Sequence, residues 1–321
     1  MNLQVRNVII FGGSGFIGTH FQSYLNNEDE IEVHSFDLRP QSGSKMLDVR
    51  GRIDIKGEFT SDDIIINLAA VHTTPGHPDH EYFETNMLGA KNVCAFAERV
   101  GIDNIIFTSS IAPYGASEDQ KTEDTLPMPN TPYGISKLVA EHIHKEWAAK
   151  DKSRRLMILR PGVVFGKGEN GNFTRLASAI SKGIFFYPGR KDTIKACIYV
   201  KELVHQAWTL FNKQEESAKT YNVAYEPAFT IEQIASAIAK VQGKKAPDIV
   251  MPSMFLNLIA IALRVTGIGN AIGIHPDRVK KLMNSTNISG EQLRKRIGRY
   301  RYNFEEALAD WYQDCDSKGL F

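Results

Sequence analysis

The stretch Asn7-Val8-Ile9-Ile10-Phe11-Gly12-Gly13-Ser14-Gly15-Phe16-Ile17-Gly18 decides the fold of this chain of 321 residues. The apolar residues 8–11 predict a buried strand, and the apolar pair Phe16-Ile17 after Gly15 predicts the start of a helix. Glycines at Gly12, Gly15 and Gly18 allow a sharp turn and a close approach of the backbone to a pyrophosphate. The first helical pair, Phe16-Ile17, then offers N–H groups and a positive dipole end to that anion. Strand, glycines and helix in this order predict a phosphate-binding turn.

An acidic residue at the end of the next predicted strand indicates which dinucleotide this turn binds. The strand over residues 31–36 is followed by Asp37, nineteen residues after Gly18. A carboxylate there accepts hydrogen bonds from an adenosine ribose and repels a 2′-phosphate. The pattern predicts NAD, although Arg39 is near enough to accommodate a phosphate and leaves NADP open. The alternative interpretation is an ordinary strand–helix turn followed by a surface acid.

The bulk composition excludes several classes of partner. The chain has 38 basic and 37 acidic residues and a net charge of +1, which argues against nucleic acid or an anionic membrane. Its three cysteines form no paired metal or redox motif and fit a reducing compartment. The apolar residues near the N-terminus belong to a predicted strand rather than to a signal peptide, so we expect a cytoplasmic protein. The longest apolar stretch, 254–265, is shorter than the roughly twenty residues of a spanning helix. We expect a buried or interfacial helix there and no membrane contact.

The order of predicted elements indicates an α/β fold with a Rossmann-type, doubly wound parallel sheet. Strands are predicted over 63–68, 104–109 and 155–160, and helices over 16–26, 79–100 and 133–150. Residues 1–165 are expected to form the NAD-binding domain, to which 195–225 return. Residues 166–194 and 226–321 are expected to form a smaller, discontinuous C-terminal lobe that binds substrate. A cleft between two such lobes is a usual site for a small molecule.

A tyrosine and a lysine four residues apart predict acid–base chemistry. Tyr133 and Lys137 lie on one face of the predicted helix. A nearby cation favours phenolate over phenol, so Lys137 and the positive nicotinamide ring of NAD⁺ would lower the pKa of Tyr133 from near 10 to about 7. The phenolate would take a proton from an alcohol while hydride leaves the same carbon. The alternative is a chance pair on an amphipathic helix.

Two hydroxyls at the end of a predicted strand support the catalytic interpretation. Ser110 is expected to hydrogen-bond the reacting oxygen, and Ser109 to brace the loop. The alternative is that both serines only cap the turn that precedes Pro113. Asn86, inside the predicted long helix, is expected to brace the floor of the site through a buried hydrogen bond; the equal alternative is that it only satisfies backbone groups there.

These motifs together resemble one known family. The set consists of the glycine turn, Asp37, Asn67-Leu68-Ala69-Ala70, Ser109-Ser110, Tyr133 with Lys137, and Leu159-Arg160-Pro161-Gly162. In this order it resembles the extended short-chain dehydrogenase/reductase family, and within it the NAD-dependent nucleotide-sugar epimerases and dehydratases. The resemblance covers nearly the whole chain.

The resemblance implies roles for further residues. Asp48 and Val49 would contact the adenine, and Ala69 and Ala70 would line the cofactor. Lys137 would also bind the nicotinamide ribose. The segment 161–164, with Pro161 and Val163, would face the nicotinamide carboxamide. The resemblance also implies a homodimer formed through the helices near 80–100 and 133–150.

Residues that differ from particular branches narrow the reaction. The 4,6-dehydratases of nucleotide sugars place an Asp-Glu pair where this chain has Ile111 and Ala112, which cannot transfer protons. The GDP-fucose synthase branch has a cysteine at the position of Ile111. The remaining Ser-Tyr-Lys set suffices for hydride transfer at one carbon, either in a 4-epimerase or in a net dehydrogenase or reductase.

The C-terminal half supplies candidates for substrate binding. The segment 170–176 resembles the one with which UDP-sugar 4-epimerases and 4-reductases reach the diphosphate, which would make Asn172 a hydrogen-bond donor to phosphate or sugar. Lys195 would replace a phosphate-binding arginine, keeping the charge but losing the bidentate fork. Arg278 and Lys281 are further diphosphate candidates. Each of these cations has the alternative of a solvated surface charge.

His72 is expected to touch the substrate. Two further histidines, His77 and His80, follow closely, but hydride chemistry in this fold needs no metal, and none is expected.

The sequence therefore predicts an NAD-dependent nucleotide-sugar epimerase that inverts C4 of a UDP-hexose by transient oxidation, with Tyr133 as base. The alternative is an NAD(P)-dependent dehydrogenase or reductase of a non-nucleotide alcohol or ketone, such as a sterol-like or aldehyde substrate. The apolar segment 254–265 and the missing arginine at position 195 motivate it. A third hypothesis is an NAD sensor without turnover, against which the Tyr–Lys pair argues.

Overall fold

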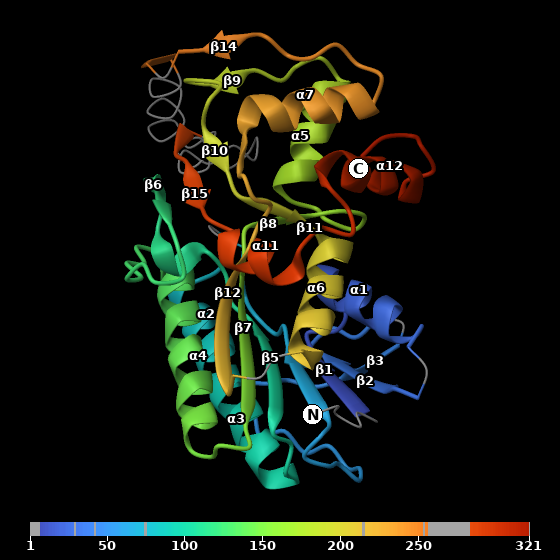
Figure 1. Cartoon of the computed structure of the whole chain (residues 1–321), viewed down its shortest axis with the longest axis vertical. Coiled ribbons are helices and arrows are strands. Elements are labelled where there is room, and N and C mark those ends of the chain that lie inside the picture. The colour runs from blue at the N-terminus through green and yellow to red at the C-terminus, as the bar shows by residue number, and fades with distance from the viewer. Residues whose placement is uncertain are drawn as a thin grey trace.

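The fold is described from a computed structural model of the chain, shown in Figure 1. The structure describes residues 7–28, 30–41, 43–73, 76–213, 216–252, 254–255 and 283–320. Arg278, Lys281 and most of the apolar segment 254–265 lie outside these residues. Within the described ranges, no helix combines the length and the apolar character needed to cross a membrane.

A seven-stranded parallel sheet forms the larger part of the molecule, in the order β12-β7-β5-β4-β1-β2-β3. Its strands are β1 (Asn7–Phe11), β2 (Glu32–Asp37), β3 (Ser44–Met46), β4 (Ile64–Asn67), β5 (Asn104–Thr108), β7 (Arg155–Pro161) and β12 (Ala218–Val223). From β1 the chain proceeds to β2 and β3 on one side and returns to β4, β5 and β7 on the other. The reversal lies between β1 and β4, where ligands bind in doubly wound sheets. The expected α/β, Rossmann-type fold is confirmed.

Alternating strand residues place one apolar layer on each face of this sheet. Val8 and Ile10 of β1 belong to one buried cluster, whereas Ile9 and Phe11 belong to the other. The first cluster contains residues of α1 (Phe16–Leu25) and α6 (Val200–Asn212). The second contains residues of α3 (Gly89–Val100) and α4 (Pro132–Ala149). Because side chains alternate along a strand, both faces are covered by helices.

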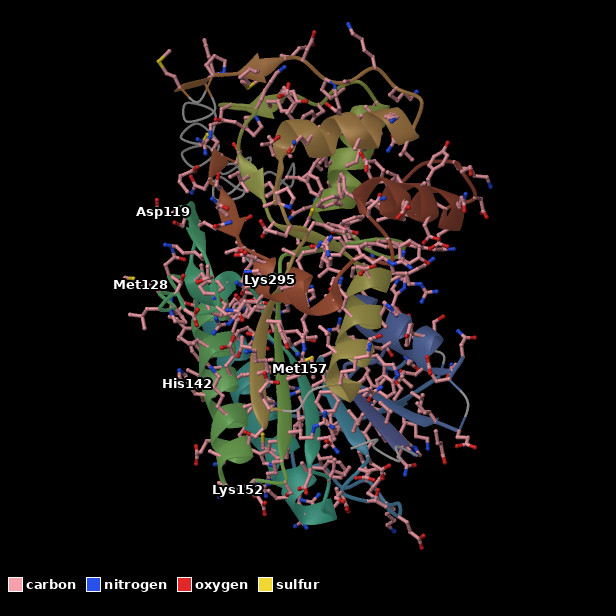
Figure 2. The ribbon with its side chains drawn as sticks, in the orientation of Figure 1. Asp119, Met128, His142, Lys152, Met157 and Lys295 are labelled. Carbon is pink, nitrogen blue, oxygen red and sulfur yellow. The ribbon has the colours of Figure 1, made fainter. Side chains whose placement is uncertain are left out.

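The helix expected over 79–100 contains an irregular turn. It consists of α2 (Asp79–Tyr82), a π-helical segment (Phe83–Leu88) and α3. Such π segments inside longer helices are rare and frequently lie at functional sites. On α4, His142 is exposed and points away from the sheet (Figure 2), whereas the adjacent Glu141 is fully buried.

The rest of the described chain adds short strands and helices beyond the carboxyl ends of the main sheet (Figure 1). A four-stranded sheet has the order β13-β10-β15-β6, and the pairs β11-β8 and β14-β9 form two smaller sheets. The strands are β6 (Ser117–Lys121), β8 (Val163–Phe165), β9 (Tyr187–Pro188), β10 (Ile194–Lys195), β11 (Cys197–Tyr199), β13 (Phe229–Thr230), β14 (Val250–Met251) and β15 (Thr286–Ile288). The helices are α5 (Asn172–Ser181), α7 (Ile231–Val241), α11 (Glu291–Ile297) and α12 (Phe304–Asp314), and a 3₁₀ turn spans Ala112–Tyr114.

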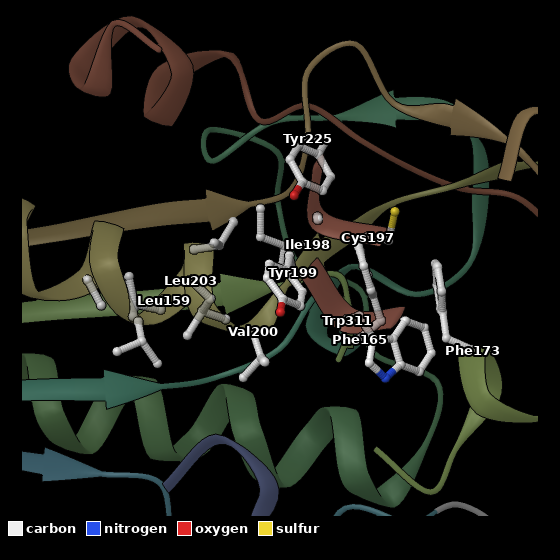
Figure 3. Packing of buried hydrophobic residues seen from close by; sticks show 14 of the residues in the cluster. Leu159, Phe165, Phe173, Cys197, Ile198, Tyr199, Val200, Leu203, Tyr225 and Trp311 are labelled. Atoms are coloured by element: carbon white, nitrogen blue, oxygen red, sulfur yellow. The ribbon is translucent and has the colours of Figure 1, made fainter. Parts of the chain in front are cut away.

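An aromatic cluster joins this upper part to the main sheet (Figure 3). Phe165 is fully buried and stacks on Phe173 of α5 with ring centroids 4.6 Å apart. Its ring also lies 5.4 Å from Tyr199 and 5.9 Å from Trp311 of α12. Residues of three other elements thus pack around one ring of β8, which fixes α5 and α12 relative to the strands.

The glycine turn after β1 is packed backbone against backbone. The N–H groups of Gly12 and Gly13 donate to the Phe36 carbonyl at 2.8 and 3.1 Å, and Gly12 has φ +83°. A Cβ on Gly18 would lie 2.4 Å from the Gly12 carbonyl oxygen and 2.6 Å from that of Gly13. The first helical turn therefore reaches this close to the strand only with glycine at position 18.

We expect Gly18→Ala to lower the unfolding free energy by about 1–3 kcal/mol, because the added methyl group must displace two backbone carbonyls. Urea unfolding of both proteins measures the difference. Gly15→Ala is the matched control, since its Cβ would meet the Gly12 oxygen at 3.3 Å. Equal losses in the two variants would contradict this account of the turn.

Candidate active site

Ser110, Tyr133 and Lys137 meet beyond the carboxyl end of β5. Ser110 follows that strand, and the other two lie in the first turns of α4. Thr131 caps α4 by accepting a hydrogen bond from the Gly134 N–H at 3.1 Å, and Pro132 occupies the first helical position. Both residues favour a helix start here. The cap therefore fixes the turn that carries the phenol.

The Ser110 hydroxyl lies against the Tyr133 phenol and acts on its pKa as a hydrogen-bond partner. The Ala112 N–H donates to Ser110 Oγ at 3.1 Å, which orients the serine. The ring of Tyr133 is half-buried and lies 6.2 Å from that of Tyr82. Burial raises the pKa of Tyr133, and the hydrogen bond from Ser110 lowers it. The structure thus brings serine and tyrosine together as the sequence predicts.

Lys137 is buried and turned toward the strand. Its Nζ donates to the Thr108 carbonyl at 2.6 Å and lies 4.5 Å from the centroid of the Phe107 ring. Burial lowers the pKa of Lys137 to about 7, against a smaller raising effect of Glu141. The groups that act on the pKa of Tyr133 are Ser110 and Tyr82. Lys137 Nζ faces the Thr108 carbonyl in this arrangement, so the expectation that it lowers the Tyr133 pKa together with NAD stays a prediction.

Asn86 braces the floor of the site from the π-helical segment. Its side chain is 3% exposed and accepts from the Val71 N–H at 2.8 Å. The amide donates to the Val71 carbonyl at 3.0 Å and to Ser136 Oγ at 2.9 Å. This side chain thereby joins the loop after β4 to α4, as expected from the sequence.

A buried ion pair that the sequence analysis missed lies beneath the serines. Arg160, the residue before the last one of strand β7, donates to Glu141 through Nε at 2.8 Å and Nη2 at 2.6 Å. Ser109 Oγ donates to the same carboxylate at 2.6 Å, so it braces the loop as predicted. Arg160 Nη1 donates to the Tyr114 hydroxyl, which donates to Asn222 Oδ1 at 2.9 Å. One signal was available: Glu141 stands one helical turn after Lys137 on the same face.

The predicted cofactor residues line the edge formed by β1, β2 and β4. Asp37 accepts hydrogen bonds from the Ser14 N–H at 3.1 Å and the Arg39 N–H at 2.9 Å. A Cβ on Gly12 would meet the Ala69 nitrogen at 2.8 Å, so the turn and the loop that carries Ala69 and Ala70 are in direct contact. Phe16 and Ile17 begin α1 behind Gly15, which caps the helix without a side chain.

The other predicted cofactor residues follow β3 or lie at the end of β7 and the start of β8. Asp48 pairs with Arg50 at 2.7 Å, and these hydrogen bonds hold its pKa below the usual value. Val49 is buried, and its carbonyl accepts from Asn92 Nδ2 at 2.8 Å. Pro161 ends β7, where its carbonyl accepts from the Ile111 N–H at 3.2 Å, and Val163 begins β8.

The predicted substrate residues are placed less uniformly. Burial and then the charge of Lys137 lower the pKa of the His72 imidazole. Asn172 begins α5 and is exposed, while the Glu169 carboxylate accepts from the Thr174 N–H at 2.9 Å in the same helical turn. Lys195 Nζ donates to the Asn284 carbonyl at 2.6 Å, and burial lowers its pKa to about 8. Arg278 falls outside the described residues.

Comparison with known proteins identifies the family. Residues 8–224 match the NAD dependent epimerase/dehydratase family, a span that holds the glycine turn, Asp37 and the Ser110–Tyr133–Lys137 group. The chain belongs to this family. The resemblance to the extended short-chain dehydrogenases/reductases is thereby confirmed, and so is the expectation of an enzyme that uses NAD.

Individual relatives are 4-epimerases. The N-acetyl-alpha-D-glucosaminyl-diphospho-ditrans,octacis-undecaprenol 4-epimerase of Escherichia coli O157:H7 is 31% identical over 298 residues, covering 89% of this chain and 88% of that protein. The UDP-glucose 4-epimerase of Bacillus subtilis is 25% identical over 285 residues, covering 75% and 83% of the two chains. The structure of a Thermus thermophilus UDP-glucose 4-epimerase in complex with NAD shares the fold, with a TM-score of 0.70, 19% identity and coverage of 97% and 99%.

The residues of this family member fit a bound NAD. A Cβ on Gly12 or Gly18 would clash with backbone atoms, so only glycine at these positions lets the turn pack this closely and bring the start of α1 up to a pyrophosphate. The Asp37 carboxylate stands at the end of β2, one strand from β1, where an adenosine ribose binds in this fold. The site therefore has the backbone cradle and the acid that this cofactor requires.

We expect Glu141→Gln to lower the unfolding free energy by about 3–5 kcal/mol, because it leaves the Arg160 guanidinium buried without its counter-charge. Chemical denaturation provides the measurement. The control is Glu98→Gln, which removes a half-exposed partner of Lys150 and Arg154 and should cost less than about 1 kcal/mol. Similar losses of unfolding free energy at the two positions would show that the buried pair stabilises the fold no more than a surface pair does.

We expect Lys137→Met to be more stable than the wild type at pH 7, with an advantage that shrinks toward pH 10. In the folded chain the pKa of Lys137 is about 7, whereas the unfolded lysine titrates near its ordinary value of 10.5. Between these values the unfolded chain binds more protons, so the wild type gains stability as the pH rises. Denaturant titrations at both pH values measure this, with Lys150→Met as control. A pH-independent difference would refute the assignment.

Proposed function

We propose that this protein is an NAD-dependent epimerase that inverts C4 of a sugar carried on a diphosphate, with a UDP-hexose as the first candidate substrate. The pairing of Ser110 with Tyr133 carries the proposal, because it sets a proton acceptor beyond the carboxyl end of β5, in the same sheet as the strand that leads into the glycine turn. Membership of the epimerase/dehydratase family and the 4-epimerase relatives support the reaction type.

Each residue of the group has a separate role in this mechanism. Tyr133 takes the proton from the C4 hydroxyl, and Ser110 holds the reacting oxygen against the phenol. A bound NAD would supply the hydride acceptor for that carbon and the hydride donor for its reduction on the opposite face of the sugar. Lys137 is anchored on Thr108 at 2.6 Å and holds the nicotinamide ribose. Asn86 holds the loop after β4 against α4, and Glu141 holds α4 against β7, so that the reacting residues keep their positions.

The cofactor contacts are part of the proposal. The N–H groups of Phe16 and Ile17 at the start of α1 hold the pyrophosphate, and Asp37 binds the adenosine ribose. The remaining contacts are those predicted from the sequence. Asp48 and Val49 flank the adenine, Ala69 and Ala70 line the dinucleotide, and Pro161 and Val163 face the nicotinamide carboxamide.

The diphosphate is the part of the substrate that we assign to the C-terminal elements. Asn172 is exposed at the start of α5, and the N-terminal dipole of that helix favours an anion. His72, whose pKa is lowered by burial and then by the charge of Lys137, is the candidate for contact with the sugar. Lys195 supplies positive charge from β10. A lipid-linked sugar diphosphate is the second candidate, because the relative that acts on an undecaprenyl-linked sugar matches most of the chain at 31% identity.

A homodimer and a cytoplasmic location remain proposals from the sequence. Met87 and Leu88, next to α3, and Ile135 on α4 are large apolar residues that are 36–39% exposed. They lie on the two helices through which the dimer is expected. Burying such residues in a partner copy is favourable because apolar surface leaves water.

We expect Tyr133→Phe to lose turnover by at least about a hundredfold while NAD binding is unchanged, because only the proton acceptor is removed. A panel of UDP-hexoses assayed for inversion at C4, with NAD affinity measured separately, tests this. The control Tyr82→Phe removes the hydroxyl group of the neighbouring tyrosine and should keep most of the activity. An epimerase returns its hydride, so NADH should not accumulate; steady NADH release would favour the dehydrogenase alternative instead.

A further inference from the structure

Large apolar side chains gather at one edge of the upper part of the molecule. Ile184 is 66% exposed, Ile249 64%, Val250 39%, Met254 65% and Phe255 54%. We call these five residues the apolar edge. Isolated exposed apolar residues are common on proteins, whereas several together mark a surface that binds a partner or a lipid.

Backbone pairing keeps these residues together. Val250 in β14 pairs with Tyr187 in β9, and the Tyr187 N–H donates to the Ile249 carbonyl at 2.8 Å. Ile184 precedes β9 by three residues. The Phe255 N–H donates to the Pro252 carbonyl at 3.1 Å, a turn that holds Met254 and Phe255 directly after β14. In Figure 1, β9 and β14 form the outermost layer, at the end farthest from the main sheet.

Positive charge accompanies the apolar edge. Lys182 is exposed at the end of α5, and Lys244 and Lys245 are exposed in the segment that leads to β14. Asp248 is the exposed acid of the same segment. The three lysines and one aspartate give this region a net positive charge beside the exposed apolar side chains. An anionic phospholipid surface attracts basic residues and takes up apolar side chains at its boundary, so the two surfaces are complementary.

Helix α5 connects this edge to the proposed diphosphate site. It begins at Asn172 and ends at Ser181, so Lys182 and Ile184 lie at its far end. Ten helical residues span about 15 Å. A sugar diphosphate whose lipid tail stays in a bilayer at the apolar edge would therefore place its phosphates within reach of Asn172.

We propose that the apolar edge docks on an anionic phospholipid bilayer and that the substrate is a sugar diphosphate carried on a lipid of that bilayer. The proposal rests on the proposed function for the sugar chemistry and replaces the expectation of no membrane contact. The protein inserts Ile184, Ile249, Met254 and Phe255 shallowly, and the lysines bind the lipid phosphates. The active site then meets a substrate that never leaves the membrane.

Vesicle flotation with the full chain tests the docking step. The vesicles are phosphatidylethanolamine with phosphatidylglycerol, and phosphatidylcholine alone serves as the neutral comparison. The test variant combines Ile184→Ser, Ile249→Ser, Met254→Ser and Phe255→Ser. The matched control combines Leu126→Ser and Met128→Ser, which are 78% and 72% exposed. Met128 lies beside α4, far from β14 (Figure 2).

We expect the wild type and the control to float with the anionic vesicles, and the test variant to lose binding about tenfold. Lys182→Glu with Lys244→Glu and Lys245→Glu should weaken binding in a salt-dependent manner. Wild type that stays unbound, or a control that loses as much as the test variant, would overturn the docking. A test variant that changes from dimer to monomer with unaltered flotation would assign the edge to a second copy and also overturn it.

Activity separates this proposal from the proposed function. The probe is a short polyprenyl-diphosphate N-acetylhexosamine in the same vesicles, compared with a UDP-hexose in solution. The test variant should lose turnover of the vesicle probe and keep the solution rate of the wild type. Equal turnover of the vesicle probe by both proteins would overturn the docking through the apolar edge. Wild type that inverts the UDP-hexose but not the vesicle probe would overturn the lipid-carried substrate. Wild type that floats but inverts neither sugar would instead refute the epimerase function.

Discussion

A buried ion pair between Glu141 and Arg160 is the contact on which the arrangement of the site depends. Glu141 is fully buried and Arg160 is 3% exposed, so each charge relies on the other and on nearby hydroxyls. The pair connects α4, which carries the phenol and the lysine, to β7, and Ser109 adds β5. A pair of this kind contributes less to net stability than to geometry, because desolvation offsets much of the attraction. Its consequence here is a fixed distance between helix and strand.

The electrostatics of the site follow from this packing. Lys137 is held in a low-dielectric position by the Phe107 ring and the Thr108 carbonyl, which brings its pKa to about 7. Burial acts in the opposite direction on Tyr133, whose phenol becomes harder to ionise. A lysine that is easily neutralised and a phenol that is hard to ionise leave the proton on the tyrosine in this arrangement. Positive charge brought by the dinucleotide is the remaining influence that favours phenolate.

The two ends of the molecule differ in chemistry: one carries the dinucleotide-binding turn, and the other carries the exposed apolar edge. The main sheet holds the dinucleotide-binding turn between helices on both faces, and the aromatic cluster around Phe165 attaches the upper elements to it. Helix α5 extends from that cluster to the exposed residues beside β14, so a rigid element links the two regions. The same helix thus connects a polar site to an apolar surface, a geometry suited to a substrate with a charged head and a lipid tail.

Local patterns in the sequence determined the Rossmann-type sheet, the glycine turn, Asp37 and the Ser110–Tyr133–Lys137 group, because each depends on backbone geometry or on spacing along one element. Tertiary structure alone decided the pairing of Glu141 with Arg160, the turn of Lys137 toward Thr108 and the gathering of the apolar edge. Those features join residues of separate elements, from α4 to β7 or from β9 to β14. Burial and charge at such contacts arise only when the elements pack, so spacing along the chain could place Glu141 on the face of Lys137 but could not reveal its partner.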